Sequence, residues 1–177
     1  MRLLIFLKDF EKIPLQTKTL LYYLYEAALC GRDIIYDQNY KYNLAIRKTL
    51  EAIVANHKAT ADDEQYQKLL VYTKRIWFSN GIHHHYNMDK MLPECTKEFF
   101  LEEANSLEAS LLPLTSGETK AQFLNLIANQ MFDPKIASKK VSLDSKTDLV
   151  KSSAVNFYEG VTQKEAEDFY TAQVEKN

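Results

Sequence analysis

The sequence predicts a mainly α-helical protein, on three observations. Gly and Pro number only four each in 177 residues, so few positions favour breaking a helix. Several segments repeat apolar residues every three or four positions, which places those residues on one side of a helix. Two Thr-x-x-Glu sequences match the capping box that opens many helices. We therefore expect one multi-helix domain over residues 1–177, with a polar loop, and with a short strand or extended arm near the C-terminal third.

The first expected helix covers residues 14–29. Pro14 suits its first turn, where the N–H that proline lacks would have no partner within the helix. Leu20 and Leu24 would lie on one apolar side, which neighbouring tyrosines broaden. Gly31 then interrupts the pattern and predicts either the end of the helix or a close backbone approach, with a bend in the chain.

A second helix is expected over residues 42–56, and a third helix follows it. Thr60, Asp62 and Asp63 supply an N-cap and first-turn acids to the third helix. Its apolar face would contain Tyr66, Leu69, Leu70, Thr73, Ile76 and Trp77. Across the chain, the residues expected in the core are Leu20, Leu24, Ile46, Leu50, Ile53, Leu69, Leu70, Ile76, Phe123 and Ile127.

Three further helices are expected in the second half of the chain. One covers residues 96–106, and the other two begin at the capping boxes Thr115-x-x-Glu118 and Thr162-x-x-Glu165. Between the last two helices, residues 140–158 show some alternation of apolar and polar side chains. This alternation favours the short strand or extended arm.

Charge and composition exclude several classes of partner. The 22 basic and 24 acidic residues are spread along the chain and give a net charge of −2, so no basic excess favours nucleic acid or anionic lipid. The apolar run at residues 3–7 is too short for a signal peptide or a membrane span. Cys30 and Cys95 are too few for a disulfide framework and have no CxxC spacing. We expect a cytoplasmic protein that binds neither nucleic acid nor membrane.

The most unusual segment is the polar loop expected after the third helix. It reads Ser79-Asn80-Gly81-Ile82-His83-His84-His85-Tyr86-Asn87. The segment has no helical period, and its Asn-Gly pair favours a tight turn.

Three interpretations of the adjacent histidines are open. Their rings could hydrogen-bond backbone groups and cap a neighbouring helix, form a rim that binds peptide, or ligate a metal. Alternation along an extended segment would place only His83 and His85 on one side. No H-E-x-x-H sequence or Cys/His spacing typical of a zinc site occurs, so we assign no metal ligand.

A second polar cluster covers residues 31–39, where Arg32, Asp33 and Asp37 fall at the expected helix break. Two carboxylates can perform acid–base chemistry when one is buried. The alternative that we favour is a charge pair between Arg32 and one aspartate, which would hold the bend. No Ser or Cys stands in a nucleophile motif such as G-x-S-x-G, so no catalytic residue is assigned.

Four segments resemble the N-terminal part of the dipeptidyl peptidase III family, particularly its Bacteroides type. They are 26–39 (EAALCGRDIIYDQN), 42–52 (YNLAIRKTLEA), 77–86 (WFSNGIHHHY) and 159–170 (EGVTQKEAEDFY). The resemblance runs from about Phe10 to Tyr170, and its most specific part is 77–86. Residues 1–9 agree poorly with the family.

The resemblance implies a two-lobed zinc exopeptidase that removes dipeptides from the free N-termini of oligopeptides. Members of the family are several times longer than this chain, and they bind zinc through H-E-x-x-G-H and E-E-x-R-A-(D/E) motifs that do not occur here. The chain would then be an N-terminal part of the substrate-binding lobe, inactive and without a cofactor alone, with zinc in the full-length parent. Its partners would be the oligopeptide and the remaining lobes of the parent.

By the same resemblance, the loop would reach the peptide-binding cleft. The residues expected to bind substrate are Asn80, Gly81, His83, His84, His85 and Tyr86. The end of the chain at Asn177, just after an expected helix, favours a truncated segment of this kind. The main alternative is a free-standing helical module that binds a protein partner, and a weaker one is metal binding by the histidines.

Overall fold

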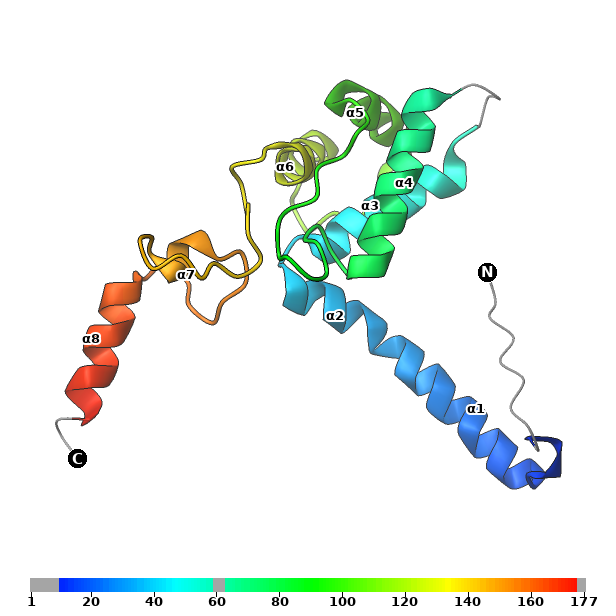
Figure 1. Cartoon of the computed structure of the whole chain (residues 1–177). Helices are drawn as coiled ribbons and strands as arrows, with labels where there is room; N and C mark the ends of the chain where they lie inside the picture. The colour runs from blue at the N-terminus through cyan, green and yellow to red at the C-terminus, as the bar shows by residue number, and fades with distance from the viewer. Residues whose placement is uncertain (1–9, 59–62, 175–177) are drawn as a thin grey trace. The chain divides into compact units, whose positions relative to one another are not determined.

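The computed structural model describes residues 10–58 and 63–174, and within them the regular structure is helical (Figure 1). The predicted fold class is therefore confirmed. Thr60 and Asp62 lie outside the described residues. The described elements are two 3-10 helices, η1 (Phe10–Lys12) and η2 (Ala109–Leu111), and the α-helices α1 (Leu15–Cys30), α2 (Arg32–Asn39), α3 (Asn43–Asn56), α4 (Glu64–Ser79), α5 (Lys97–Ser106), α6 (Lys120–Phe132), α7 (Leu149–Ser152) and α8 (Gln163–Val174).

The chain divides into two units between Ile35 and Tyr36. Helix α1 belongs to the first unit, and none of its residues is buried. Leu20 and Leu24 are 57% and 56% exposed, so the prediction that they lie in the core is wrong. The apolar pattern identified the helix correctly. It did not identify a buried side, because apolar side chains surround α1 instead of forming one stripe.

The polar cluster at residues 31–39 is helical. Gly31 has right-handed helical dihedrals, φ −74° and ψ −8°, and α2 begins at the next residue. Arg32, Asp33 and Asp37 therefore lie on a helix and not in an irregular loop. Gly31 ends α1 without the left-handed conformation that glycine often supplies at helix ends.

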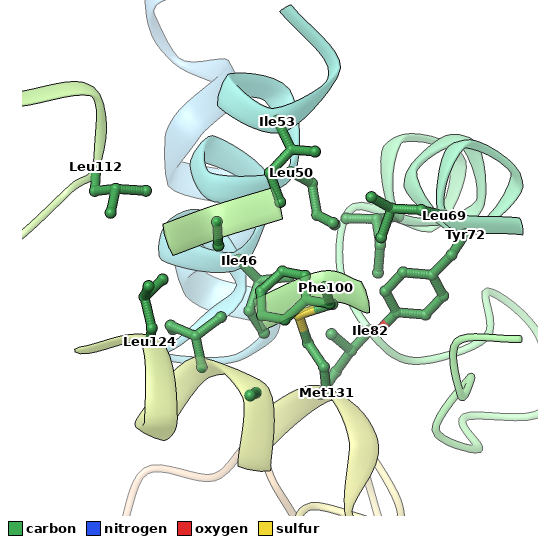
Figure 2. Packing of buried hydrophobic residues seen from close by; sticks show 14 of the residues in the cluster. Ile46, Leu50, Ile53, Leu69, Tyr72, Ile82, Phe100, Leu112, Leu124 and Met131 are labelled. Carbon is green, nitrogen blue, oxygen red and sulfur yellow. The ribbon is translucent and has the colours of Figure 1, made fainter. Parts of the chain in front are cut away.

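The core of the second unit lies between α3, α4, α5 and α6, and Figure 2 shows side chains from these helices pointing toward one another. Seven of the predicted core residues are at most 3% exposed: Ile46, Leu50, Ile53, Leu69, Ile76, Phe123 and Ile127. Leu70 is only half-buried and Trp77 is 38% exposed. Tyr72 is buried on this helix instead of Leu70 and Trp77. The inward face of α4 is therefore rotated about the helix axis relative to the prediction.

Side chains set the starts of several helices. Asp63 accepts the N–H of Tyr66 at 2.8 Å to cap α4, and Thr96 accepts the N–H of Phe99 at 3.2 Å to cap α5. The predicted box at Thr162 is present, because its amide N–H donates to Glu165 at 2.7 Å at the start of α8. Each bond satisfies an amide group that has no partner within its own helix.

The predicted helix start at Thr115 is wrong. Thr115 and Glu118 do bond to each other, with Oγ1 to Oε2 at 2.9 Å. Helix α6 nevertheless begins at Lys120, behind a second capping box formed by Thr119 and Gln122. The reason is Gly117, whose φ of 82° is left-handed and incompatible with continuing a right-handed helix from Thr115.

Of the short strand or extended arm expected over residues 140–158, the short strand is not formed. Asp148 accepts the N–H of Lys151 at 3.0 Å and starts the short helix α7 in this segment. The backbone pairing of this segment includes Ala154 N to Lys139 O and Val155 N to Lys140 O, each at 3.0 Å. Among the described residues, β-pairing is limited to isolated bridges, and no extended ladder of strands forms.

Replacing Leu69, which is fully buried, by Ala should reduce the free energy of unfolding by about 2–5 kcal/mol, because it leaves a cavity in the close-packed core. The matched control is Leu70→Ala on the neighbouring, half-buried position, which should cost clearly less. Urea denaturation followed by far-UV circular dichroism measures both. Equal losses for the two variants would mean that the inward face of α4 is misassigned.

Candidate functional site

The loop Ser79–Asn87 begins with a sharp change of chain direction at the end of α4. Asn80 adopts a left-handed conformation with φ 52°, and Gly81 has φ 148°. A Cβ on Gly81 would lie only 2.0 Å from Nδ2 of Asn43, so no other residue fits there without displacing the asparagine. Oδ1 of Asn43 accepts the N–H of Ile82 at 3.0 Å. The first residue of α3 therefore holds the start of the loop.

Backbone bonds hold the base of the loop. His84 N donates to Asp89 O at 2.7 Å and Met91 N donates to Ile82 O at 2.8 Å, which joins the two sides of the loop. The segment after α6 pairs with the returning side, through Lys90 N to Ser138 O at 3.0 Å and Lys140 N to Met88 O at 2.8 Å.

Lys90 adds a side-chain anchor to this base. Its ammonium group donates to the carbonyl oxygens of Asp133 and Ile136, at 2.6 and 2.9 Å, just beyond the end of α6. Burial lowers the pKa of Lys90 to about 8, which nearby Asp133 partly opposes. The base of the loop is thus fixed to helix α3 and to the segment that follows α6.

His83 belongs to this base. It is 3% exposed, its Nε2 lies 2.8 Å from the carbonyl oxygen of Ala137, and its ring makes an edge contact with Tyr40. A carbonyl accepts only, so Nε2 carries the ring proton. Burial lowers the pKa of His83, the bond to Ala137 opposes that shift, and the charges of Lys90 and Lys140 lower the pKa further. His83 is therefore a neutral, structural histidine.

The tip of the loop, His84, His85 and Tyr86, is exposed. Nδ1 of His84 accepts the N–H groups of Tyr86 and Asn87 at 3.2 and 3.4 Å, so the ring proton lies on Nε2. Tyr86 is 78% exposed, and the ring of His85 makes edge contacts with Tyr86 and Phe78. The tip therefore presents three adjacent rings with N–H and O–H groups.

A cavity of about 450 Å³ adjoins this tip. It is lined by Val71, Lys74, Arg75, Phe78, Ser79, His84 and Met91. Most of these residues lie on the outward side of α4, and His84 connects the cavity to the loop. An apolar cavity with a few polar groups is the usual form of a small-ligand site.

The described residues do not fit a metal site. His83 is buried and His85 is exposed, so the two do not share an exposed side as alternation would require. No group of three or more His, Cys, Asp or Glu side chains in residues 10–58 and 63–174 is arranged to hold a metal ion. No reaction step through zinc is derived from these residues.

Both cysteines are free thiols, Cys30 exposed and Cys95 buried. Burial raises the pKa of Cys95 to about 11, which keeps it protonated at neutral pH and therefore a poor nucleophile. In the part of the chain that is described, no helix has both the length and the apolar character needed to cross a membrane.

Comparison with protein-family models finds no family that matches the chain, and no curated protein matches it either. The resemblance to dipeptidyl peptidase III therefore stays a prediction.

The structure brings the predicted site residues together in one loop but gives them different positions. Gly81 and His83 are buried in its base, Asn80 is half-buried, and the other three form the tip. Sequence reasoning missed the cavity, although its signal is visible at Val71, Lys74, Arg75 and Phe78. Their i, i+3, i+4, i+7 spacing marks a second stripe on α4.

Because the pKa of His83 is lowered in the folded chain, the unfolded chain binds its proton more readily. The stability that neutral His83 contributes is fully present above a pH of about 6.5, its usual pKa, and is lost as pH falls toward the folded pKa. His83→Gln should therefore reduce the loss of unfolding free energy between pH 7.5 and pH 5. Urea titrations at both pH values measure this loss. An unchanged loss in His83→Gln would contradict the assignment.

Proposed function

We propose that this chain binds short peptides as a non-catalytic segment of a zinc peptidase similar to dipeptidyl peptidase III. The observation that carries the proposal is the tip His84, His85 and Tyr86, held on a rigid base beside a cavity. A binding element gains affinity when it is ordered before its ligand arrives, because less conformational entropy is lost on binding.

The chemistry of the tip suits an extended peptide. Nε2–H of His84 is available to donate to a peptide carbonyl, since Nδ1 already accepts from the backbone. The ring of Tyr86 offers an apolar surface that would cover a peptide side chain. Gly81 and His83 contribute by positioning these groups, since both are buried.

No residue of the chain is assigned to catalysis. Hydrolysis by a zinc peptidase needs a metal held by about three protein ligands, with a water in the remaining position. In this proposal the zinc and its ligands belong to the other lobe of the parent protein. The localisation that fits such an enzyme is the cytoplasm, as expected from the cysteine usage.

The alternative, a helical module that binds a protein partner, is favoured by one observation. Helix α1 is apolar on all sides, with exposed residues that include Leu21, Tyr22, Tyr23 and Tyr25. Helices of this kind are normally covered. In the first proposal the cover is the rest of the parent chain, and in the alternative it is a separate protein.

Tyr86→Ala should weaken the binding of a dye-labelled pentapeptide with a free N-terminus about tenfold, which corresponds to about 1.4 kcal/mol. Fluorescence anisotropy measures the affinity, and mass spectrometry should find the peptide intact after incubation with added zinc. The matched control is Tyr25→Ala, an exposed tyrosine on α1, which should bind normally.

Three results would contradict the proposal in different ways. Loss of binding in Tyr25→Ala but not in Tyr86→Ala would move the binding surface to α1 and favour the interaction module. No binding by the wild-type chain would remove the peptide-binding role. Chelator-sensitive release of a dipeptide would show a catalytic site that the proposal lacks.

A further inference from the structure

Helix α4 has apolar side chains on two opposite faces. The inward face packs in the core through Leu69, Tyr72 and Ile76, each at most 1% exposed. The opposite face carries Val71, Lys74, Arg75 and Phe78, spaced so that all four lie on one side of the helix. Val71 is 44% exposed and Phe78 is 72% exposed. A surface helix usually carries polar residues on its outer face, so two apolar residues at this spacing indicate a contact surface.

The cavity next to the tip is built on this outward face. Val71, Phe78 and Met91 supply its apolar lining, and Lys74, Arg75 and His84 supply polar groups. Its volume of about 450 Å³ falls in the range of small-ligand sites, which is about 300–1,000 Å³. The space therefore suits one large side chain together with an adjoining polar group.

The basic and imidazole groups that line the cavity, from Lys74, Arg75 and His84, can act as donors, and Ser79 adds a hydroxyl. The guanidinium of Arg75 is already paired, with Nη1 at 2.8 Å from Oε1 of Glu94. Lys74 makes no ion pair with any residue that the structure describes. His84 has its ring proton on Nε2, since Nδ1 accepts backbone N–H groups. The cavity thus offers an ammonium and an imidazole N–H beside an apolar surface, which is complementary to a carboxylate next to an apolar group.

We infer that the cavity between α4 and the loop tip binds a peptide residue that combines an apolar side chain with an adjacent carboxylate. The side chain lies against Phe78 and Met91, and the carboxylate pairs with Lys74 and accepts from His84. The inference rests on the proposed function, because it assigns the part of the peptide that this cavity selects. The carboxylate comes from the C-terminus of the peptide or from an acidic residue beside the apolar one.

The test compares four dye-labelled peptides that differ only at the end bearing phenylalanine. One ends in Phe with a free carboxylate and one in Phe amide, and two amidated peptides end in Phe-Asp and Phe-Asn. In at least one of the two pairs, the wild-type chain should bind the peptide that carries the extra carboxylate about tenfold more tightly than its neutral partner, which is Phe amide in the first pair and Phe-Asn in the second. A preference limited to the first pair identifies the C-terminal carboxylate as the source, and one limited to the second identifies the acidic side chain.

Two variants test which cavity residues produce the preference for the acidic peptides. Lys74→Gln should abolish the preference for the acidic peptide and leave the affinity for the neutral peptide within about twofold. Phe78→Ala should weaken all four peptides. The matched control is Lys68→Gln on the same helix, outside the cavity and paired with Glu64, and it should keep the wild-type preference. Circular dichroism spectra establish that each variant is folded.

The possible failures are distinguishable. If the wild-type chain binds acidic and neutral peptides equally well, the inference is wrong while the proposed peptide-binding role stands. The inference is also wrong if the preference persists in Lys74→Gln. If no peptide binds at all, the proposed function and the inference fail together.

Discussion

The close contact between Gly81 and Asn43 is the constraint on which the rest of the candidate site depends. Asn43 is fully buried at the first residue of α3, and its amide lies in the space that a side chain at position 81 would need. From there it accepts the N–H of Ile82. The same helix carries Ile46 and Leu50 into the core, so the packing of the core fixes the point where the loop begins.

This constraint separates the loop into a base and a tip. The base is buried and bonded, through Ile82, His83 and Lys90, to α3 and to the segment after α6. In the tip, Nδ1 of His84 accepts the backbone N–H groups of Tyr86 and Asn87, and the three rings remain exposed. An arrangement of this kind presents functional groups on a surface loop while the scaffold beneath sets their positions, as is common for binding loops.

Most of the helices could be predicted from the sequence, because apolar periodicity and capping residues are local signals. The inward face of α3 and the cap at Thr162 are examples. Local signals failed where a contact with distant residues, or a particular backbone conformation, determines the structure. Whether Leu20 is exposed depends on contacts between α1 and distant residues. The delayed start of α6 depends on the left-handed conformation of Gly117.

The candidate site was predictable in its location but not in its division of roles. Three adjacent histidines mark the loop in the sequence, yet their separate environments depend on contacts with residues far along the chain. Ala137, which bonds His83, is 54 residues away, and Asn43 is 39 residues from Ile82. The cavity had a visible signal in the second stripe of α4, but the placement of His84 and Met91, which also line the cavity, could not be read from that stripe.

Hydrogen exchange of the Ile82 amide, followed by nuclear magnetic resonance, tests most directly whether the contact of Asn43 with Gly81 holds the loop. The wild-type amide should exchange slowly, because it is buried and bonded to Asn43. Gly81→Ala should displace the asparagine and make this amide exchange at least about tenfold faster, whereas Gly117→Ala should leave it protected, since both glycines have positive φ but position 117 has open space around it. Fast exchange in the wild-type chain, or unchanged protection in Gly81→Ala, would contradict this explanation of the loop.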